Sequence, residues 1–299
     1  AADLAGLCKG KPVTIQSVIS KDKSEAAPRL YDLTALQREA NTVLGYTAQQ
    51  TLDYTQSLYE KKLCTYPRTD SRYLTDDMES RVPEIVAIAA KLCEVPAPLA
   101  INSKQVCNSS KVTDHYAIIP TKICEETDPD TLPTGEREIL KLIARSVLRA
   151  VSGSFQYTET EVTASCEAKT FTVKGKTVTD PGWRRYMERE NEEKPLPPLT
   201  EGQTLQVSAA SVKESKTNPP KRYTEASILA AMESAGDQDM PEDAEHHGIG
   251  TPATRAGIIE KLVAAGPTAA TSETNPTTEP SAATASSCPT ARQQPKATT

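Results

Sequence analysis

The sequence has no long apolar run and no segment typical of a secretory signal. Its best apolar stretch, Ile85 to Leu92, is interrupted by Lys91 and is far shorter than the roughly 18 apolar residues of a membrane span. No basic-then-apolar segment opens the chain, and its first residue is not Met. We therefore expect a soluble, cytoplasmic protein with no membrane partner, and a first residue that is not the start of the natural gene product.

Basic residues are not in excess either. Lys and Arg together number 34 and Asp and Glu number 40, which gives a formal net charge of -6 at pH 7. Binding to phosphate backbones depends on clustered Lys and Arg. The charge balance therefore argues against a general binder of polyanions, although it leaves room for a local basic groove.

The seven cysteines do not occur in C-x-x-C pairs and are scattered along the chain. An odd, unclustered set predicts reduced thiols in a reducing compartment. It also argues against zinc fingers and zinc ribbons, whose ligands are clustered.

A length of 299 residues predicts about two domains, and the first half has the pattern of helices. Thr-x-x-Gln capping boxes predict helices that begin at Thr34 and Thr47, the first ending at Gly45 and the second at about Lys62. Further helical segments are predicted at the following places: 76–92, with a start or break at Pro83; from Thr134 onward, with Ile139, Ile143 and Val147 on the buried face; Thr224–Ala235; and Thr251–Leu262.

Between Phe155 and Val207 the apolar residues alternate with a period of two, which predicts strands with a hairpin turn at Lys174-Gly175. A short strand is also predicted at 11–18, followed by a polar linker at 21–27. Beyond Gly266 the composition is dominated by Thr, Ala, Ser and Pro, and we expect disorder there. The fold class predicted from these patterns is α+β.

Tyr66 and Arg68 form the most informative pair of polar residues. Pro67 fixes its own φ and keeps Tyr66 out of the helical region, so this segment is extended or a turn. Residues two apart in an extended chain point to the same side. A phenol and a guanidinium could then face one phosphate, whose charge the guanidinium would neutralise. From spacing alone, a Tyr-Pro turn with a surface Arg explains the pattern better than catalysis does.

Four segments occur in the order known from one enzyme family. They are Leu58–Leu74, which contains Cys64-Thr65-Tyr66-Pro67-Arg68-Thr69-Asp70-Ser71; Asp114–Thr121; Pro219–Ala226; and Gly248–Arg255. Together they resemble type IA DNA topoisomerases, most closely the bacterial topoisomerase III branch, over roughly residues 1–265. The resemblance implies a bacterial, DNA-associated isomerase that cuts a single strand through a 5′-phosphotyrosine intermediate, passes a strand and religates the break without ATP.

The resemblance also assigns roles to single residues. It implies that Tyr66 is the nucleophile, that Arg68 orients and neutralises the scissile phosphate, and that His115 belongs to the active region. Asp114 precedes this histidine where the family usually has a small residue, which leaves the local hydrogen bonding open. The positions that match DNA contacts are Gln56 and Glu60 on the helix before the tyrosine, Arg72, and Thr254 and Arg255 after the Gly-rich helix entry.

The family's Mg²⁺ site lies in an N-terminal Toprim domain with an acidic cluster, and nothing before Tyr66 has that form. We expect no metal ligands in this chain, and we interpret it as an internal fragment or a truncated product. We also expect the chain alone to lack efficient relaxation activity. Its partners would be the Toprim domain and single-stranded or negatively supercoiled DNA.

The combined architecture predicts a mainly helical domain at 29–154 that carries Tyr66 and is inserted in a β-rich arch formed by 1–28 and 155–218. Residues 219–266 would begin a helical domain that lines a DNA groove, and 267–299 would be the disordered tail. The sequence leaves open the preference between relaxation and decatenation, the DNA sequence preference and the oligomeric state.

The same residues also fit other functions. The main one is a catalytically incomplete module that only binds single-stranded DNA. A tyrosine recombinase fits less well, because its tyrosine lies near the C-terminus. Gly175-Lys176-Thr177 imitates a P-loop, but Thr170 stands where the first glycine should be. The Asp, Glu and His residues at 237–247 are interpreted as a solvated acidic loop rather than a metal cluster.

Overall fold

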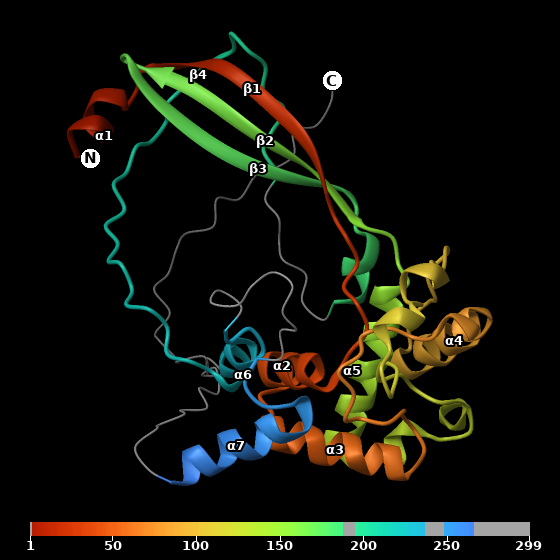
Figure 1. Cartoon of the computed structure of the whole chain (residues 1–299). Helices are drawn as coiled ribbons and strands as arrows, with labels where there is room; N and C mark the ends of the chain where they lie inside the picture. The colour runs from red at the N-terminus through yellow and green to blue at the C-terminus, as the bar shows by residue number, and fades with distance from the viewer. Residues whose placement is uncertain (1, 188–194, 237–247, 266–299) are drawn as a thin grey trace, which may run out of the picture.

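The computed structural model describes residues 2–187, 195–236 and 248–265. Within these ranges the protein consists of a packed helical body and a long curved antiparallel sheet that extends away from it (Figure 1). An extended segment, residues 207–224, runs from the far end of the sheet back to the helices. The mixed α+β class is therefore confirmed. No helix among the described residues is both long enough and apolar enough to cross a membrane.

The helical body contains α2 (Leu33–Leu44), α3 (Ala48–Glu60), α4 (Val82–Cys93) and α5 (Thr134–Ala150). Short 3-10 helices connect them, with these bounds: η1 (Asp76–Arg81), η2 (Ser103–Gln105), η3 (Ser109–Lys111), η4 (Lys122–Glu125) and η5 (Pro129–Thr131). Helix α4 has proline at its second position. An N–H in the first turn has no partner within the helix, so proline loses no hydrogen bond there.

The helix boundaries mostly follow local capping chemistry. The Thr47–Gln50 capping box begins α3 as predicted, and Gly45 ends α2 with φ of 74°. The predicted start of α2 at Thr34 is wrong, because the N-cap is Asp32, whose carboxylate accepts a hydrogen bond from the Ala35 amide at 2.6 Å.

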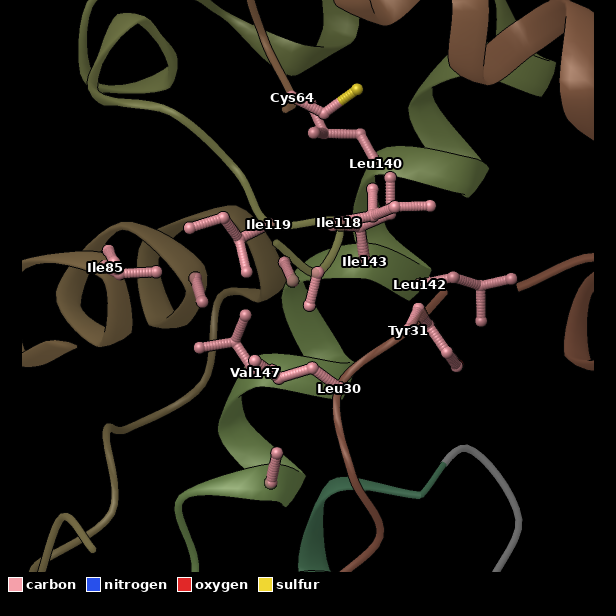
Figure 2. Close-up of a cluster of buried hydrophobic side chains, with 14 of the residues drawn as sticks. Leu30, Tyr31, Cys64, Ile85, Ile118, Ile119, Leu140, Leu142, Ile143 and Val147 are labelled. Atoms are coloured by element: carbon pink, nitrogen blue, oxygen red, sulfur yellow. The ribbon is translucent and has the colours of Figure 1, made fainter. Parts of the chain in front are cut away.

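The core of the body forms around α5. Buried side chains from α4, α5, the Leu30–Tyr31 segment and the Ile118–Ile119 segment meet there, as Figure 2 shows. Ile143 and Leu148 of α5 are completely buried. Gly135 in the first turn of α5 permits close packing, since a Cβ at this position would lie 2.4 Å from the ring of Tyr54 on α3. This core fixes the backbone segments that carry the candidate site.

The sheet has the strand order β3-β2-β1-β4, and all pairings are antiparallel. Its strands are β1 (Pro12–Glu25), β2 (Phe155–Cys166), β3 (Lys169–Asp180) and β4 (Thr204–Gln206). Helix α1 (Ala2–Cys8), which the sequence patterns did not predict, lies at the far end of the sheet, and η6 (Gly182–Tyr186) lies where the sheet meets the body (Figure 1).

Two sequence expectations about the sheet are wrong. The predicted linker at 21–27 belongs largely to β1, where Lys21 pairs with Glu159 across the ladder. The hairpin turn lies at Glu167–Ala168, both with positive φ, and not at Lys174-Gly175. Gly175 lies inside β3, where the side chain of Leu196 packs so closely that an added Cβ would meet it at 2.3 Å.

The last described helices are α6 (Glu225–Glu233) and α7 (Pro252–Ala264), which begin at Thr224 and Thr251 as predicted. Their apolar contact with the start of α3 is a small cluster of Ala48, Leu229, Ala256 and Ile259. The acidic 237–247 segment and the tail at 267–299 lie outside the described residues.

Candidate active site

The Tyr66 segment leaves the end of α3 as extended chain, as expected from Pro67. It pairs with the segment around Ile119: the Thr65 amide donates to the Ile119 carbonyl at 3.1 Å, and the Thr121 amide donates to the Leu63 carbonyl at 3.1 Å. Cys64 and Pro120 form an isolated antiparallel bridge at the same place. The tyrosine is therefore mounted on a short, well-bonded ladder next to the core.

Tyr66 lies against two other aromatic rings. Its ring centroid is 4.4 Å from that of His115, with an angle of 45° between the planes. Tyr59 contacts the same ring edge-on, with centroids 5.4 Å apart. These residues line an open cleft of 360 Å³ together with Lys62, Cys64, Thr65, Tyr116 and Thr121. Tyr66 is half-buried, so its side chain is supported on one side and accessible from the cleft.

Arg68 lies at the surface, two residues after Tyr66. Its side chain is exposed, it is not one of the residues that line the cleft, and it makes no hydrogen bond or ion pair with any residue that the structure describes. The structure therefore brings His115, but not Arg68, into the cleft with Tyr66. A guanidinium without a carboxylate partner remains available for an anion.

Gln56 and Glu60 share one face of α3, as predicted. The Gln56 amide donates to the Glu60 carboxylate at 3.0 Å, and both side chains lie at the surface. Tyr59 connects this helix to the cleft.

Three other predicted DNA contacts have structural partners. Arg72 binds Asp32 at 2.5 Å and Glu233 at 3.2 Å. Arg255 is 3% exposed, and its guanidinium donates to the Ile249 carbonyl and to the Thr34 hydroxyl.

Thr254, the third of these residues, completes the capping box of α7 with Thr251. The side chains of Arg72, Thr254 and Arg255 thus hold α6 and α7 in place rather than lining the Tyr66 cleft.

Comparison with known proteins decides the family. A family model described as DNA topoisomerase matches residues 1–279. DNA topoisomerase 3 of Bacillus licheniformis and that of Bacillus subtilis are each 38% identical to this chain, over 87% and 85% of it. The chain belongs to the type IA DNA topoisomerase family.

This topoisomerase chain spans 38% of the length of each of these two relatives. A structure of full-length topoisomerase I from Thermotoga maritima has the same fold over 88% of this chain and 42% of its own, with a TM-score of 0.68 and 23% sequence identity. The fold of this chain is therefore shared with that solved topoisomerase I.

Several residues around the topoisomerase cleft were not singled out by the sequence as site residues. Tyr59, Lys62, Tyr116 and Thr121 line it. Lys62 follows the C-cap of α3 and has φ of 62°, in the left-handed region that favours glycine. Its ammonium has no carboxylate partner among the described residues, whereas that of Lys61 pairs with Glu136. In the sequence, Lys62 is marked as a site residue only by its place beside Lys61 just before the tyrosine motif.

The cleft is poorly suited to hold Mg²⁺ by itself. Magnesium prefers oxygen ligands, above all carboxylates, and the lining residues include none. The described part of the chain also contains no group of three His, Cys, Asp or Glu residues arranged to bind a metal. Cys64 does not offer a thiolate, because burial, with a smaller effect of Cys124, raises the pKa of its thiol far above the usual value.

Proposed function

We propose that this chain is the tyrosine-bearing part of an ATP-independent topoisomerase that cuts one DNA strand, passes a second strand and reseals the first. The proposal is carried by one observation: Tyr66, at the centre of the family motif, lies half-buried in an open cleft with its ring against His115. A phenol that only filled space in the core would be enclosed by apolar side chains.

In the proposed reaction the Tyr66 oxygen attacks the phosphorus of a DNA phosphodiester. An Oη–P bond forms and the P–O3′ bond breaks, and the phenolic proton goes to the departing 3′ oxygen. The products are a 5′-phosphotyrosine and a free 3′-hydroxyl, and resealing reverses both changes. One phosphodiester is exchanged for another of similar energy, so the reaction needs no ATP.

The neighbouring side chains support this chemistry in different ways. His115 lies beside the phenol and can relay the proton. Arg68, exposed and without a described carboxylate partner, can neutralise the phosphate oxygens, and guanidinium groups match phosphate geometry well. Gln56 and Glu60 extend the polar surface along α3.

We do not extend this DNA surface to Arg72 and Arg255. Contact of these two arginines with DNA stays a prediction. To bind Arg72, a DNA strand would have to displace Asp32 and Glu233, and to bind Arg255 it would have to displace Thr34. The same holds for Thr254, whose hydroxyl is part of a helix cap.

We place the metal of the reaction outside this chain, because no carboxylate lines the cleft. When bound, Mg²⁺ would supply positive charge near the scissile phosphate. A Toprim domain, which the family resemblance implies as a partner, would provide its ligands. The 299-residue chain alone would bind single-stranded DNA weakly and would not relax negatively supercoiled plasmid.

A chimera tests this function. The matching segment of the B. licheniformis relative is replaced by this chain, and the protein is incubated with Mg²⁺ and a single-stranded oligonucleotide labelled on the 3′ side of the cut. We expect a protein–DNA adduct that survives denaturant and disappears in Tyr66→Phe. Retention of the oligonucleotide without an adduct would instead support the alternative, a non-catalytic binding module, which the lack of carboxylates in the cleft favours.

A further inference from the structure

We propose that Thr65 and Thr69 are positioning residues, whose hydroxyl groups hold the backbone around His115 in register with Tyr66. The consequence for DNA cleavage rests on the proposed function, but the positioning itself is a property of this chain. Neither threonine has a role in the reaction scheme above.

The proposal starts from the alternation along the extended Tyr66 segment. Pro67 and Thr69 are buried, whereas Arg68 and Asp70 are exposed and Tyr66 lines the cleft. This period of two is the geometry of extended chain, in which successive side chains point to opposite sides. Thr69 faces the protein interior, whereas Thr65 is half-buried at the edge of the cleft, from which it reaches the 115–119 segment.

Thr65 joins the segment to the chain just after His115. Its hydroxyl donates to the Ala117 carbonyl at 3.0 Å and accepts a hydrogen bond from the Ile119 amide at 3.0 Å. Its own amide donates to the Ile119 carbonyl at 3.1 Å. Thr65, next to the tyrosine, therefore holds the backbone on both sides of Ile118.

Thr69 acts on the histidine directly. Its hydroxyl donates to the His115 carbonyl at 2.7 Å and accepts from the Ser71 amide at 3.1 Å. The side chain is 2% exposed, and the Thr69 carbonyl accepts a hydrogen bond from the Leu33 amide at the start of α2. The contact to His115 is thus made from a rigid point of the helical body.

The two threonines flank Tyr66 in the sequence and bond to the segment that begins with His115. A hydroxyl that both donates and accepts cannot be replaced by a methyl group of the same size without leaving a buried carbonyl or amide unpaired. Removal of either hydroxyl would let the 115–119 segment shift, and the His115 ring would lose its fixed place against Tyr66.

The first experiment measures positioning in the 299-residue chain itself. Thr65→Val and Thr69→Val remove the hydroxyl, Thr65→Ser and Thr69→Ser keep it, and Thr55→Val removes a buried hydroxyl that bonds only within α3. Nuclear Overhauser contacts between the Tyr66 and His115 rings are recorded by NMR, with circular dichroism as the test of folding. We expect these contacts to weaken in both valine variants and to persist in both serine variants and in Thr55→Val.

The second experiment measures cleavage in the chimera over a range of oligonucleotide concentrations up to saturation. A misplacement of about 1 Å at a reacting group can slow a reaction by about a hundredfold, so we expect Thr69→Val to lower the rate of adduct formation by about ten- to a hundredfold, with KM nearly unchanged. Thr69→Ser should recover most of the rate. Thr55→Val should leave it within about twofold.

The outcomes separate the two proposals. If the parent chimera forms no adduct, the proposed function fails, and the ring contacts measured by NMR still decide the positioning. If the parent is active and Thr65→Val and Thr69→Val retain both its ring contacts and its rate, the threonines do not position His115. A serine variant as impaired as the valine variant would also overturn the proposal, since the hydroxyl would then not be the group that matters.

Discussion

The helical body and the sheet are stabilised in different ways. The body encloses a continuous apolar core around α5, in which residues such as Ile139 and Ile143 are completely buried. In contrast, Ile15 is the only buried residue of β1, and Gly175 is the only one of β3. The sheet therefore depends on its backbone ladder and on pairs such as Lys23 with Glu159, which form at its surface.

This difference explains where the candidate site lies. Tyr66 and His115 lie beside the packed core, although the His115 side chain itself is exposed. Nearby residues of their segments, Cys64 and Ala117, belong to the core, where displacements are costly because the interior is close-packed. The long sheet has few buried contacts that would resist bending. We infer that the body preserves the geometry of the site while the sheet can flex, and the following variants test this contrast.

The largest effect should come from truncating the core of the body. Ile143→Ala removes a fully buried side chain and should lower the free energy of unfolding by about 2–5 kcal/mol. Ile19→Ala on β1, where the side chain is 51% exposed, should cost less than about 1 kcal/mol. Urea unfolding of both variants at one pH measures the two values. Equal losses would mean that the sheet is held by packing that the exposed fractions do not reveal.

The second effect is a pH dependence that comes from packing in the body. Burial, opposed by weaker effects of nearby cations, raises the pKa of the Cys93 thiol to about 11. Above pH 9 the thiol of the unfolded chain loses its proton, which lowers the free energy of the unfolded state. The folded chain keeps the proton and is not stabilised in this way. The stability contributed by the neutral thiol is therefore complete below the unfolded pKa and is lost as the pH rises toward 11, by about 2–3 kcal/mol in total.

Cys93→Ala isolates this contribution from those of other titrating groups. Urea unfolding of both proteins from pH 8 to pH 11, in the presence of a reducing agent, should show a steeper loss of stability for the parent. The absolute offset from the lost side chain does not matter, because only the slopes are compared. Parallel slopes would show that the thiol ionises equally easily in the folded and unfolded chains.

A third and smaller effect should appear where the two regions meet. The Arg184 guanidinium lies 3.8 Å from the centre of the Phe155 ring at the base of β2 and binds the Glu25 carboxylate at 2.7 Å. We expect Arg184→Ala to cost about 1–2 kcal/mol and to speed amide hydrogen exchange at the end of β1. Lys174→Ala, which removes the surface ion pair with Glu161 within the sheet, is the control. Unchanged exchange near Glu25 would argue against a role for Arg184 in fixing the sheet to the body.

Local chemistry made much of the fold predictable. Thr47, Thr224 and Thr251 begin their helices as predicted, because a cap is made by residues three apart in the sequence. The predicted N-cap of α2 is wrong because Thr34-x-x-Gln37 imitates a capping box. The Gln37 amide instead donates to the Ala48 carbonyl, and the Asp32 carboxylate caps the helix. The Lys174-Gly175 pair predicts a turn, but Gly175 lies inside β3 and leaves room for the side chain of Leu196. The alternation pattern does not connect these two residues.

The site was predictable to the extent that it is contiguous. The motif around Tyr66 could be identified as one segment, and the family resemblance added His115, whose ring the structure places 4.4 Å from that of Tyr66. Arg72 and Arg255 are also cations in matching segments, but their partners Glu233 and Thr34 lie 161 and 221 residues away. Such distant pairings depend on tertiary structure, and local patterns carry no information about them.

The smallest effect on stability should come from residues with left-handed backbone conformation, of which the body and the sheet each contain at least one. Lys62, with φ of 62°, follows α3 in the body, and Ala168, with φ of 57°, lies in the β2–β3 turn. Glycine adopts this conformation without a Cβ clash, so Lys62→Gly and Ala168→Gly should each stabilise the chain by about 0.5–1 kcal/mol. Only Lys62→Gly also removes an ammonium from the Tyr66 cleft, and it alone should weaken binding of a single-stranded oligonucleotide at low salt. Urea unfolding and fluorescence anisotropy measure the two properties, and equal oligonucleotide affinities in the two variants would show that the strained lysine contributes nothing to the cleft.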